Sequence, residues 1–397
     1  MEIWKLINYK YIHISLLILI SSLFLSACHE LDANDYYPDR EDESMELCLS
    51  LDPGNAIFSR AVNTTDPLHD SFINHREGDF RILIYTSDQN LLTVLTDREL
   101  NFNESNVSGW YTIDARIIQD SPELYIVALL NWNSIGSISH YPAFNDSPIS
   151  DFPYHTLESL WATNKEFSLD SNQGESWYPS IEDKRLVPMF GVSRINIAEN
   201  VTLNQGKRII NVTIPVVRSL AKISFEVSDE LYARGFDMNY CSISNYNSSG
   251  FFNPDMSLSG NSMDGKGNLT ITKASSPNQT PVSGALMFTN MNGQPGKKKL
   301  VAYLPEMDNS GLTTNNEERP MLNVSLTYEN EKFAGDKIIE LSNYSEEGLI
   351  PDNSPLFDVV RNNYYAYTIT DIDENQNIKL KYTVCPWTRL ETEIEFN

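Results

Sequence analysis

VTIPVVRSLAKISFEV, residues 212–227, is the stretch of sequence that decides the fold. It contains two apolar runs, IINVTIPVV (209–217, in part) and AKISFEV (221–227), separated by three residues. The second run alternates apolar and polar side chains with the period of a strand in a sheet with one wet face. The stretch therefore predicts two successive strands of an all-β protein.

Similar runs recur along the chain, separated by clusters of Asn, Asp, Gly and Pro, which is typical of strands joined by turns. Further strands are predicted at 45–52, 80–85, 124–132, 299–304, 363–370 and 378–384. The segment 156–164, with Leu157, Leu160 and Trp161 on one side, is the one convincing helix candidate. We expect this helix to pack over an edge or an end of the first domain.

The division of the chain into domains follows from its length and from one polar stretch. About 370 residues follow Cys28, which suggests two domains of ordinary size. Asn204 to Lys207 is the best place for a boundary, giving domains at 61–206 and 207–397. Turn-rich stretches at 133–155 and 242–266 are expected to be exposed loops. Two tandem β-sandwich domains are the predicted architecture.

The N-terminus carries the pattern of an export signal. Lys5 and Lys10 precede an apolar core from Ile14 to Leu25, which is short for a membrane span. Leu25-Ser26-Ala27-Cys28 matches the lipobox of bacterial lipoproteins. Residues 1–27 are predicted to be a signal peptide, and the Cys28 thiol is predicted to carry a diacylglycerol anchor in the outer membrane. An ordinary signal peptide followed by a chance cysteine is the alternative.

Charge and cysteine content exclude several classes of protein. The formal charge is −25, which argues against nucleic acid or anionic lipid as a partner. The three cysteines after Cys28 are Cys48, Cys241 and Cys385. No two of them have metal-ligand spacing and their number is odd, so free buried thiols are predicted.

The common catalytic and metal-binding motifs do not occur in the sequence. The sequence has no G-x-S-x-G, H-E-x-x-H or C-x-x-C pattern. Residues 371–377 resemble the start of a calcium loop but lack its sixth-position glycine, so a hairpin turn is predicted instead. Trp132, Trp177 and Tyr178 could stack on sugars, although packing is the expected use of each. We therefore expect no enzyme activity, no metal and no cofactor.

Two segments near opposite ends of the chain share one pattern. MELCLSLD places Met45, Leu47, Leu49 and Leu51 on one face of a strand. LETEIEF, near the C-terminus, does the same with Leu390, Thr392, Ile394 and Phe396. Chain ends are usually frayed unless they are held, so a patterned strand at 390–396 raises the question of which sheet it joins.

Five segments occurring in order resemble those of one family: RLVPMFG (185–191), VVRSLAKISFEV (216–227), VAYLPE (301–306), RNNYYAYTI (361–369) and KYTVCPW (381–387). Together with the lipobox, they are similar to segments of fimbrillins, the type V pilin subunits of Bacteroidales-type bacteria. The resemblance covers about Met45 to Asn397. It implies two transthyretin-like, immunoglobulin-like β-sandwiches and a cell-surface fimbria, with adhesion and biofilm growth as the role.

The resemblance also implies a processing step. In polymerising fimbrillins an Arg-specific protease removes the first strand, and the C-terminal strand of another subunit fills the vacated groove. By that resemblance, residues 28–60 are a propeptide, the cut falls between Arg60 and Ala61, and 45–52 is the displaced strand. Strand 390–396 is then the donor, and the implied partners are other subunits, the protease, membrane lipid before processing, and a surface receptor.

Several alternatives stay open at this point. Residues 45–52 could form a permanent strand beside an ordinary turn Arg60, with 390–396 the last strand of its own sandwich. Stalk, tip and anchor roles are all compatible with the sequence, and the receptor is not identified by it. The rivals from other classes are a monomeric glycan-binding lipoprotein and a surface glycoside hydrolase, which would require two carboxylates facing one cleft.

Overall fold

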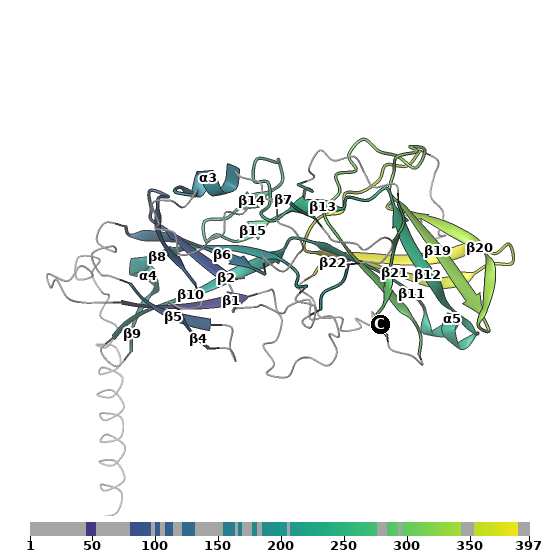
Figure 1. Cartoon of the computed structure of the whole chain (residues 1–397), viewed down its shortest axis with the longest axis horizontal. Coiled ribbons are helices and arrows are strands. Elements are labelled where there is room, and N and C mark those ends of the chain that lie inside the picture. Colours follow the sequence, from purple (N-terminus) through teal and green to yellow (C-terminus); the bar gives the residue numbers. More distant parts are fainter. Residues whose placement is uncertain are drawn as a thin grey trace, which may run out of the picture.

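The computed structural model describes residues 45–52, 80–96, 100–103, 108–113, 121–131, 154–162, 166–168, 177–180, 185–204, 207–275, 284–292, 296–342 and 353–387. Figure 1 shows two β-sandwiches lying one after the other along the long axis of the molecule. The predicted all-β architecture of two sandwiches is confirmed.

The first sandwich is a path of strands that folds over into two layers. One layer has the order β3-β2-β6-β8-β10 and the other has β10-β1-β5-β4, with β9 also paired to β10. The strands are β1 (Met45–Asp52), β2 (Phe80–Tyr85), β3 (Leu91–Leu95), β4 (Asn101–Asn103), β5 (Ser108–Ile113), β6 (Glu123–Leu130), β8 (Met189–Asn196), β9 (Val201–Asn204) and β10 (Lys207–Arg218). The buried side chains of β1, β2, β3, β6, β8 and β10 belong to one hydrophobic core.

Strand β10 joins the two layers of the first sandwich. Residues 208–215 pair in parallel with β1, whereas 216–218 pair with β8 in the other layer. The change of partner falls at Pro215, which has no N–H to donate to a ladder. A boundary at 206/207 was therefore wrong, because β10 belongs to the first sandwich. Its polar beginning at Lys207 resembled a linker locally.

Gly191 makes the close approach of β8 to β10 possible. A Cβ atom at this position would lie 2.6 Å from the Pro215 carbonyl oxygen and 2.6 Å from Cγ1 of Val216. We expect Gly191→Ala to lower the free energy of unfolding by about 1–3 kcal/mol, the usual cost of overpacking. Gly335→Ala is the control, since no atom lies within 4 Å of its added Cβ. Equal urea midpoints for the two variants would contradict this reading.

The second sandwich packs a sheet of order β17-β18-β11-β21-β22 against one of order β16-β12-β19-β20. Its strands are β11 (Ala221–Val227), β12 (Phe236–Ser244), β16 (Leu286–Met287), β17 (Thr289–Asn290), β18 (Lys299–Leu304), β19 (Met321–Tyr328), β20 (Glu331–Glu340), β21 (Asn363–Ile372) and β22 (Ile378–Pro386). Phe225 stacks on Tyr367 in its core, with 4.6 Å between ring centroids. Helix α5 (Asp229–Ala233) is capped by Ser228, whose Oγ accepts from the Leu231 amide.

Several other predicted strands, the predicted helix and one predicted turn are present in the structure. Strands at 80–85, 221–227 and 299–304 are confirmed to the residue. The predicted helix is confirmed as α3 (Leu157–Ala162), with Leu157 and Leu160 buried in the first core. The turn at 371–377 is also confirmed, because it joins β21 to β22 and Asp373 accepts from the Asn377 amide at 2.7 Å.

Strand β22 runs further than the sequence suggested. The predicted strand ended at 384, but in the structure Pro386 pairs with Asn363 at the last step of the β21–β22 ladder. The proline is tolerated because β22 is an edge strand. Figure 1 shows this yellow strand running back toward the junction of the two sandwiches.

Residues 245–275, here called the strap, return from the second sandwich to cover the first. Strand β13 (Ser249–Phe251) pairs with β7 (Glu166–Ser168), and β14 (Ser262–Met263) pairs with β15 (Leu269–Thr270). The Arg194 amide of β8 donates to the Lys266 carbonyl at 2.8 Å, and Phe252 enters the first core. The expectation of an exposed loop at 242–266 was thus wrong for 242–254, which are mostly buried, whereas 255–266 are mostly exposed or half-buried.

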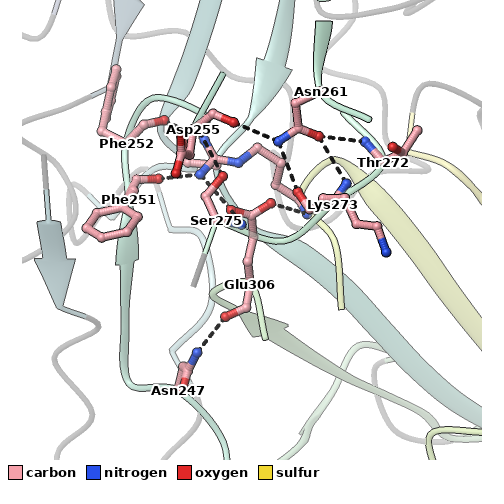
Figure 2. A network of polar contacts seen from close by, with 11 residues as sticks. Asn247, Phe251, Phe252, Asp255, Asn261, Thr272, Lys273, Ser275 and Glu306 are labelled. Carbon is pink, nitrogen blue, oxygen red and sulfur yellow. Dashed lines mark hydrogen bonds and ion pairs between the residues drawn. The ribbon is translucent and has the colours of Figure 1, made fainter. Parts of the chain in front are cut away.

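A buried ion pair holds the base of the strap (Figure 2). Arg361 Nη2 lies 2.7 Å from Glu306 Oε2, and the two side chains are 0 % and 1 % exposed. The Arg361 guanidinium also donates to the carbonyls of Phe251 and Phe252 at 2.9 and 2.8 Å. Glu306 Oε2 in turn accepts from the Ser275 amide at 2.9 Å. The pair therefore fastens both ends of the strap to the second sandwich.

Candidate strand-exchange site

Strand β1 is an inner strand of the first sandwich. It pairs in parallel with β10 from Met45↔Arg208 to Asp52↔Pro215, and antiparallel with β5 from Met45↔Ile113 to Ser50↔Ser108. Both of its edges are thus occupied by neighbouring strands. β1 lies between β5 and β10, two strands that come much later in the chain.

The apolar face of β1 is completely buried. Met45, Leu47, Leu49 and Leu51 are 1, 0, 3 and 2 % exposed and all lie in the first core. At about 1.5–3 kcal/mol for each buried side chain, the four contribute roughly 6–12 kcal/mol, an upper estimate since unfolded chains are partly compact. The predicted strand and its predicted face are both present, and withdrawing the strand would open a deep apolar slot between β5 and β10.

The other face of β1 is polar and partly covered. Ser50 Oγ donates to the Val212 carbonyl at 3.3 Å and lies 3.1 Å from Thr213 Oγ1, both on β10. Burial raises the pKa of the Cys48 thiol, which keeps it protonated and unreactive at neutral pH. These contacts fix the strand laterally but supply no catalytic group.

Cys48, Cys241 and Cys385, the three cysteines that the structure describes, are not in disulfides. Cys241 is fully buried and its thiol pKa is raised by that burial, whereas Cys48 and Cys385 are only partly buried. Within the described ranges no group of three or more His, Cys, Asp or Glu side chains could hold a metal ion. In the same ranges no helix is long and apolar enough to cross a bilayer.

The remaining predicted site residues lie outside the described ranges. These are Cys28, Arg60, Ala61, Leu390, Thr392, Ile394 and Phe396. The last described residue is Trp387, which is 7 % exposed and packs in the first core although it follows a strand of the second sandwich. The C-terminal segment (residues 388–397) therefore starts at the junction of the two sandwiches.

Sequence reasoning did not single out Arg218, the residue that contacts Trp387 there. Arg218 is 2 % exposed although it ends the strongly apolar run of β10. An arginine flanked by Val216, Val217 and Leu220 could have been recognised as a buried charge, and buried charges have dedicated partners. Its partner, however, is far away in sequence and could not have been named.

The second sandwich has an open cleft of about 920 Å³ beside β22. Phe357, Tyr365 and Tyr382 form one wall and stack on each other, with 5.6 and 6.3 Å from Phe357 to the two tyrosine rings. Asp358, whose pKa is raised mainly by burial, is the only carboxylate among the lining residues that the structure describes. A single carboxylate does not form the pair that glycoside hydrolysis requires.

Trp177 does not face solvent either. It is 1 % exposed and packs edge-on to Tyr303 with 5.9 Å between ring centroids. The expected packing role is confirmed for this tryptophan, so its ring is not available to stack on a sugar. Trp132, the other aromatic of the glycan-binding rival, lies outside the described residues.

Three comparisons place the chain among known proteins. No family model and no curated protein matches it. The solved tip fimbrial protein Mfa3 of Porphyromonas gingivalis, with a C-terminal truncation, is similar at 13 % identity and a TM-score of 0.49, covering 87 % of this chain and 100 % of that one. A fimbrial assembly protein of Parabacteroides distasonis is similar at 12 % identity and a TM-score of 0.39, covering 86 % and 98 %.

Both likenesses extend over most of this chain. Fimbrial proteins of Bacteroidales-type bacteria are thus among the solved structures that this two-sandwich chain resembles.

Proposed function

We propose that this chain is a structural subunit of a cell-surface fimbria that supports adhesion. It is exported as a lipoprotein anchored through Cys28, is cleaved between Arg60 and Ala61, and polymerises by strand exchange. The observation that carries the proposal is the placement of β1, an inner strand with a completely buried apolar face, inserted between β5 and β10. The chain has no enzymatic role in this account.

Cleavage after Arg60 converts β1 from part of the chain into a bound peptide. In the uncleaved chain, covalent attachment gives β1 a very high effective concentration at its slot. After cleavage only the contacts of residues 45–52 hold it, and once it leaves it can diffuse away. The processed body then exposes an apolar slot flanked by two strand edges, a surface that readily takes up another strand.

Residues 390–396 have the spacing needed to occupy that slot. Leu390, Thr392, Ile394 and Phe396 follow the same every-second-residue pattern as Met45, Leu47, Leu49 and Leu51. Burying the three apolar side chains contributes roughly 1.5–3 kcal/mol each, and each restored ladder hydrogen bond about 1 kcal/mol. A strand added from a neighbouring subunit is an established recognition mode. Repeated head to tail, it does not close and gives a filament.

The partners in this account are other fimbrial subunits, an Arg-specific protease and a surface receptor, with outer-membrane lipid as a partner before processing. A stalk subunit loses both its lipid and β1, whereas an anchor keeps both. A cleavable Arg60 and a patterned C-terminal strand favour the stalk.

Limited digestion of a purified Arg389→Lys chain with an Arg-specific protease tests the proposal, because this substitution keeps the donor residues 390–396 attached during the digestion. Three arginines precede β2, and cutting after Arg40 leaves β1 attached, whereas cutting after Arg60 or Arg76 frees it. We expect cleavage after Arg60, loss of the β1 peptide and growth of oligomers in size-exclusion chromatography. A chain with both Arg60→Ala and Arg76→Ala should remain monomeric, and Arg76→Ala alone, the matched control, should behave as the parent chain. Cleaved chain that stays monomeric with residues 28–60 still bound would overturn the proposal.

A further inference from the structure

Trp387, the residue from which the C-terminal segment starts, is held on several sides. Its amide donates to the Asn362 carbonyl at 2.7 Å, and its carbonyl accepts from Arg218 Nη1 at 3.1 Å. The Arg218 guanidinium lies 4.8 Å from the Trp387 ring, and the Tyr303 ring lies 5.5 Å from it. Main chain and side chain are therefore both fixed at this residue.

Arg218 belongs to the strand that borders the β1 slot. Residues 208–215 of β10 pair with β1, and Arg218 follows three residues later at the end of the same strand. Its own amide and Nη1 both donate to Asn362 Oδ1, at 3.2 and 3.4 Å. Asn362 holds this position with a φ of 57°, a conformation that asparagine tolerates well. One strand thus connects the acceptor slot with Trp387, where the C-terminal segment begins.

We propose that Arg218 and Trp387 form a clamp that fixes the point and direction in which the C-terminal segment leaves the body, and so positions it for donation to a neighbouring subunit. The inference rests on the proposed strand exchange and adds positioning residues to it. The clamp residues do not enter the slot themselves; they act through the segment that begins at Thr388.

The physical reason is conformational entropy. A donor strand must lose the freedom of its backbone when it docks, at about 1–2 kcal/mol for each residue ordered. Holding Trp387 in advance removes part of that cost and limits the directions that the following residues can take. The Arg218 guanidinium makes one cation–π contact and one hydrogen bond to Trp387. Its rigid, planar shape allows it to make both contacts at once and so to hold Trp387 in one orientation.

The first test uses a monomer with Arg60→Ala and Arg76→Ala, which keeps β1 when the protease is added, so the test does not depend on strand exchange. An Arg-specific protease can also cut after Arg389, two residues beyond Trp387, but only when the main chain around the bond becomes extended and accessible. We expect Arg218→Met to raise the rate of this cut about 10-fold, since proteolysis follows the population of the released form. Lys222→Met is the matched control, because Lys222 also lies over the Trp387 ring, at 5.9 Å, but belongs to β11 and not to β10.

The second test separates donation from acceptance in chains processed after Arg60. A synthetic peptide of residues 388–397 reports on the slot, and the assembly rate reports on slot and donor together. We expect Arg218→Met to bind the peptide within about 2-fold of the unaltered chain but to assemble about 10-fold more slowly. Trp387→Phe, which keeps an aromatic ring over the guanidinium, should restore most of the rate lost in Trp387→Ala.

Each result then has one meaning. If Arg218→Met left the rate of the cut after Arg389 unchanged, Arg218 would not hold Trp387 in place. A faster cut together with a normal assembly rate would show that holding Trp387 does not contribute to assembly. If Arg218→Met lost peptide binding and assembly to the same extent, Arg218 would be needed for the fold of the slot and not for positioning the C-terminal segment. If the unaltered processed chain neither binds peptide nor assembles, strand exchange itself fails, whereas the cut after Arg389 still reports whether Trp387 is held.

Discussion

Leu47→Asp is expected to unfold the first sandwich of the uncleaved chain, with a loss of at least 4 kcal/mol in the free energy of unfolding. Leu47 is 0 % exposed in the middle of β1, so the substitution removes a buried side chain and places an unpaired carboxylate in its position. Loss of a buried leucine alone costs about 2–5 kcal/mol, and burial of an uncompensated charge costs more. Urea unfolding followed by tryptophan fluorescence measures the change.

Leu203→Asp is the matched control, because it makes the same substitution on β9 of the same sheet. Leu203 is 65 % exposed, and surface substitutions usually change stability by less than about 0.5 kcal/mol. A Leu47→Asp chain as stable as the Leu203→Asp chain would show that β1 is not a required strand. The proposal adds that the defect is confined to the uncleaved form, since a chain beginning at Ala61 has no position 47.

Glu306→Ala is expected to cost about 3–5 kcal/mol, the usual loss when one partner of a buried ion pair is removed. The substitution leaves the Arg361 guanidinium buried without its carboxylate and deprives the Ser275 amide of its acceptor. The Ser275 end of the strap loses its acceptor, whereas the Phe251–Phe252 end stays bonded to an Arg361 that has lost its counter-charge. The strap should therefore become sensitive to protease from its Ser275 end before either core unfolds. Digestion with mass spectrometry of fragments from 245–275 measures this opening.

Two further variants separate the ion pair from general charge effects. Asp371→Ala breaks the exposed pair with Arg234 and should change stability little, because solvent screens such pairs. Replacing both Glu306 and Arg361 with methionine should recover much of the loss, since apolar substitution of a whole buried pair is often tolerated. A Glu306→Ala variant that unfolds like Asp371→Ala would show that the pair does not fasten the strap.

Strands with local signals could be predicted closely from the sequence. FRILIY, AKISFEV and KLVAYL match β2, β11 and β18 to the residue, because the apolar run and its flanking turns lie in adjacent positions. The one-faced pattern of 45–52 likewise predicted both β1 and its buried side. Which strands flank it could not be predicted, since β5 and β10 come from distant parts of the chain.

The wrong domain boundary and the wrongly expected exposed loop have the same cause, because long-range contacts determine the structure of both segments. The start of β10 looked like a linker because Lys207 is polar, but its pairing with β1 and β9 places it in the first sandwich. The strap looked like a loop because turn residues are frequent in it, whereas its burial comes from β7 and from Arg361. Arg361 and Glu306 are 55 positions apart, and no local pattern pairs them.

N-terminal sequencing of the protein taken from the cell surface as denaturant-resistant assemblies tests the central claim most directly. The account predicts chains that begin at Ala61, without β1 and with the slot between β5 and β10 occupied by a neighbour's strand. Chains that all begin at a lipid-modified Cys28, with β1 retained, would contradict it.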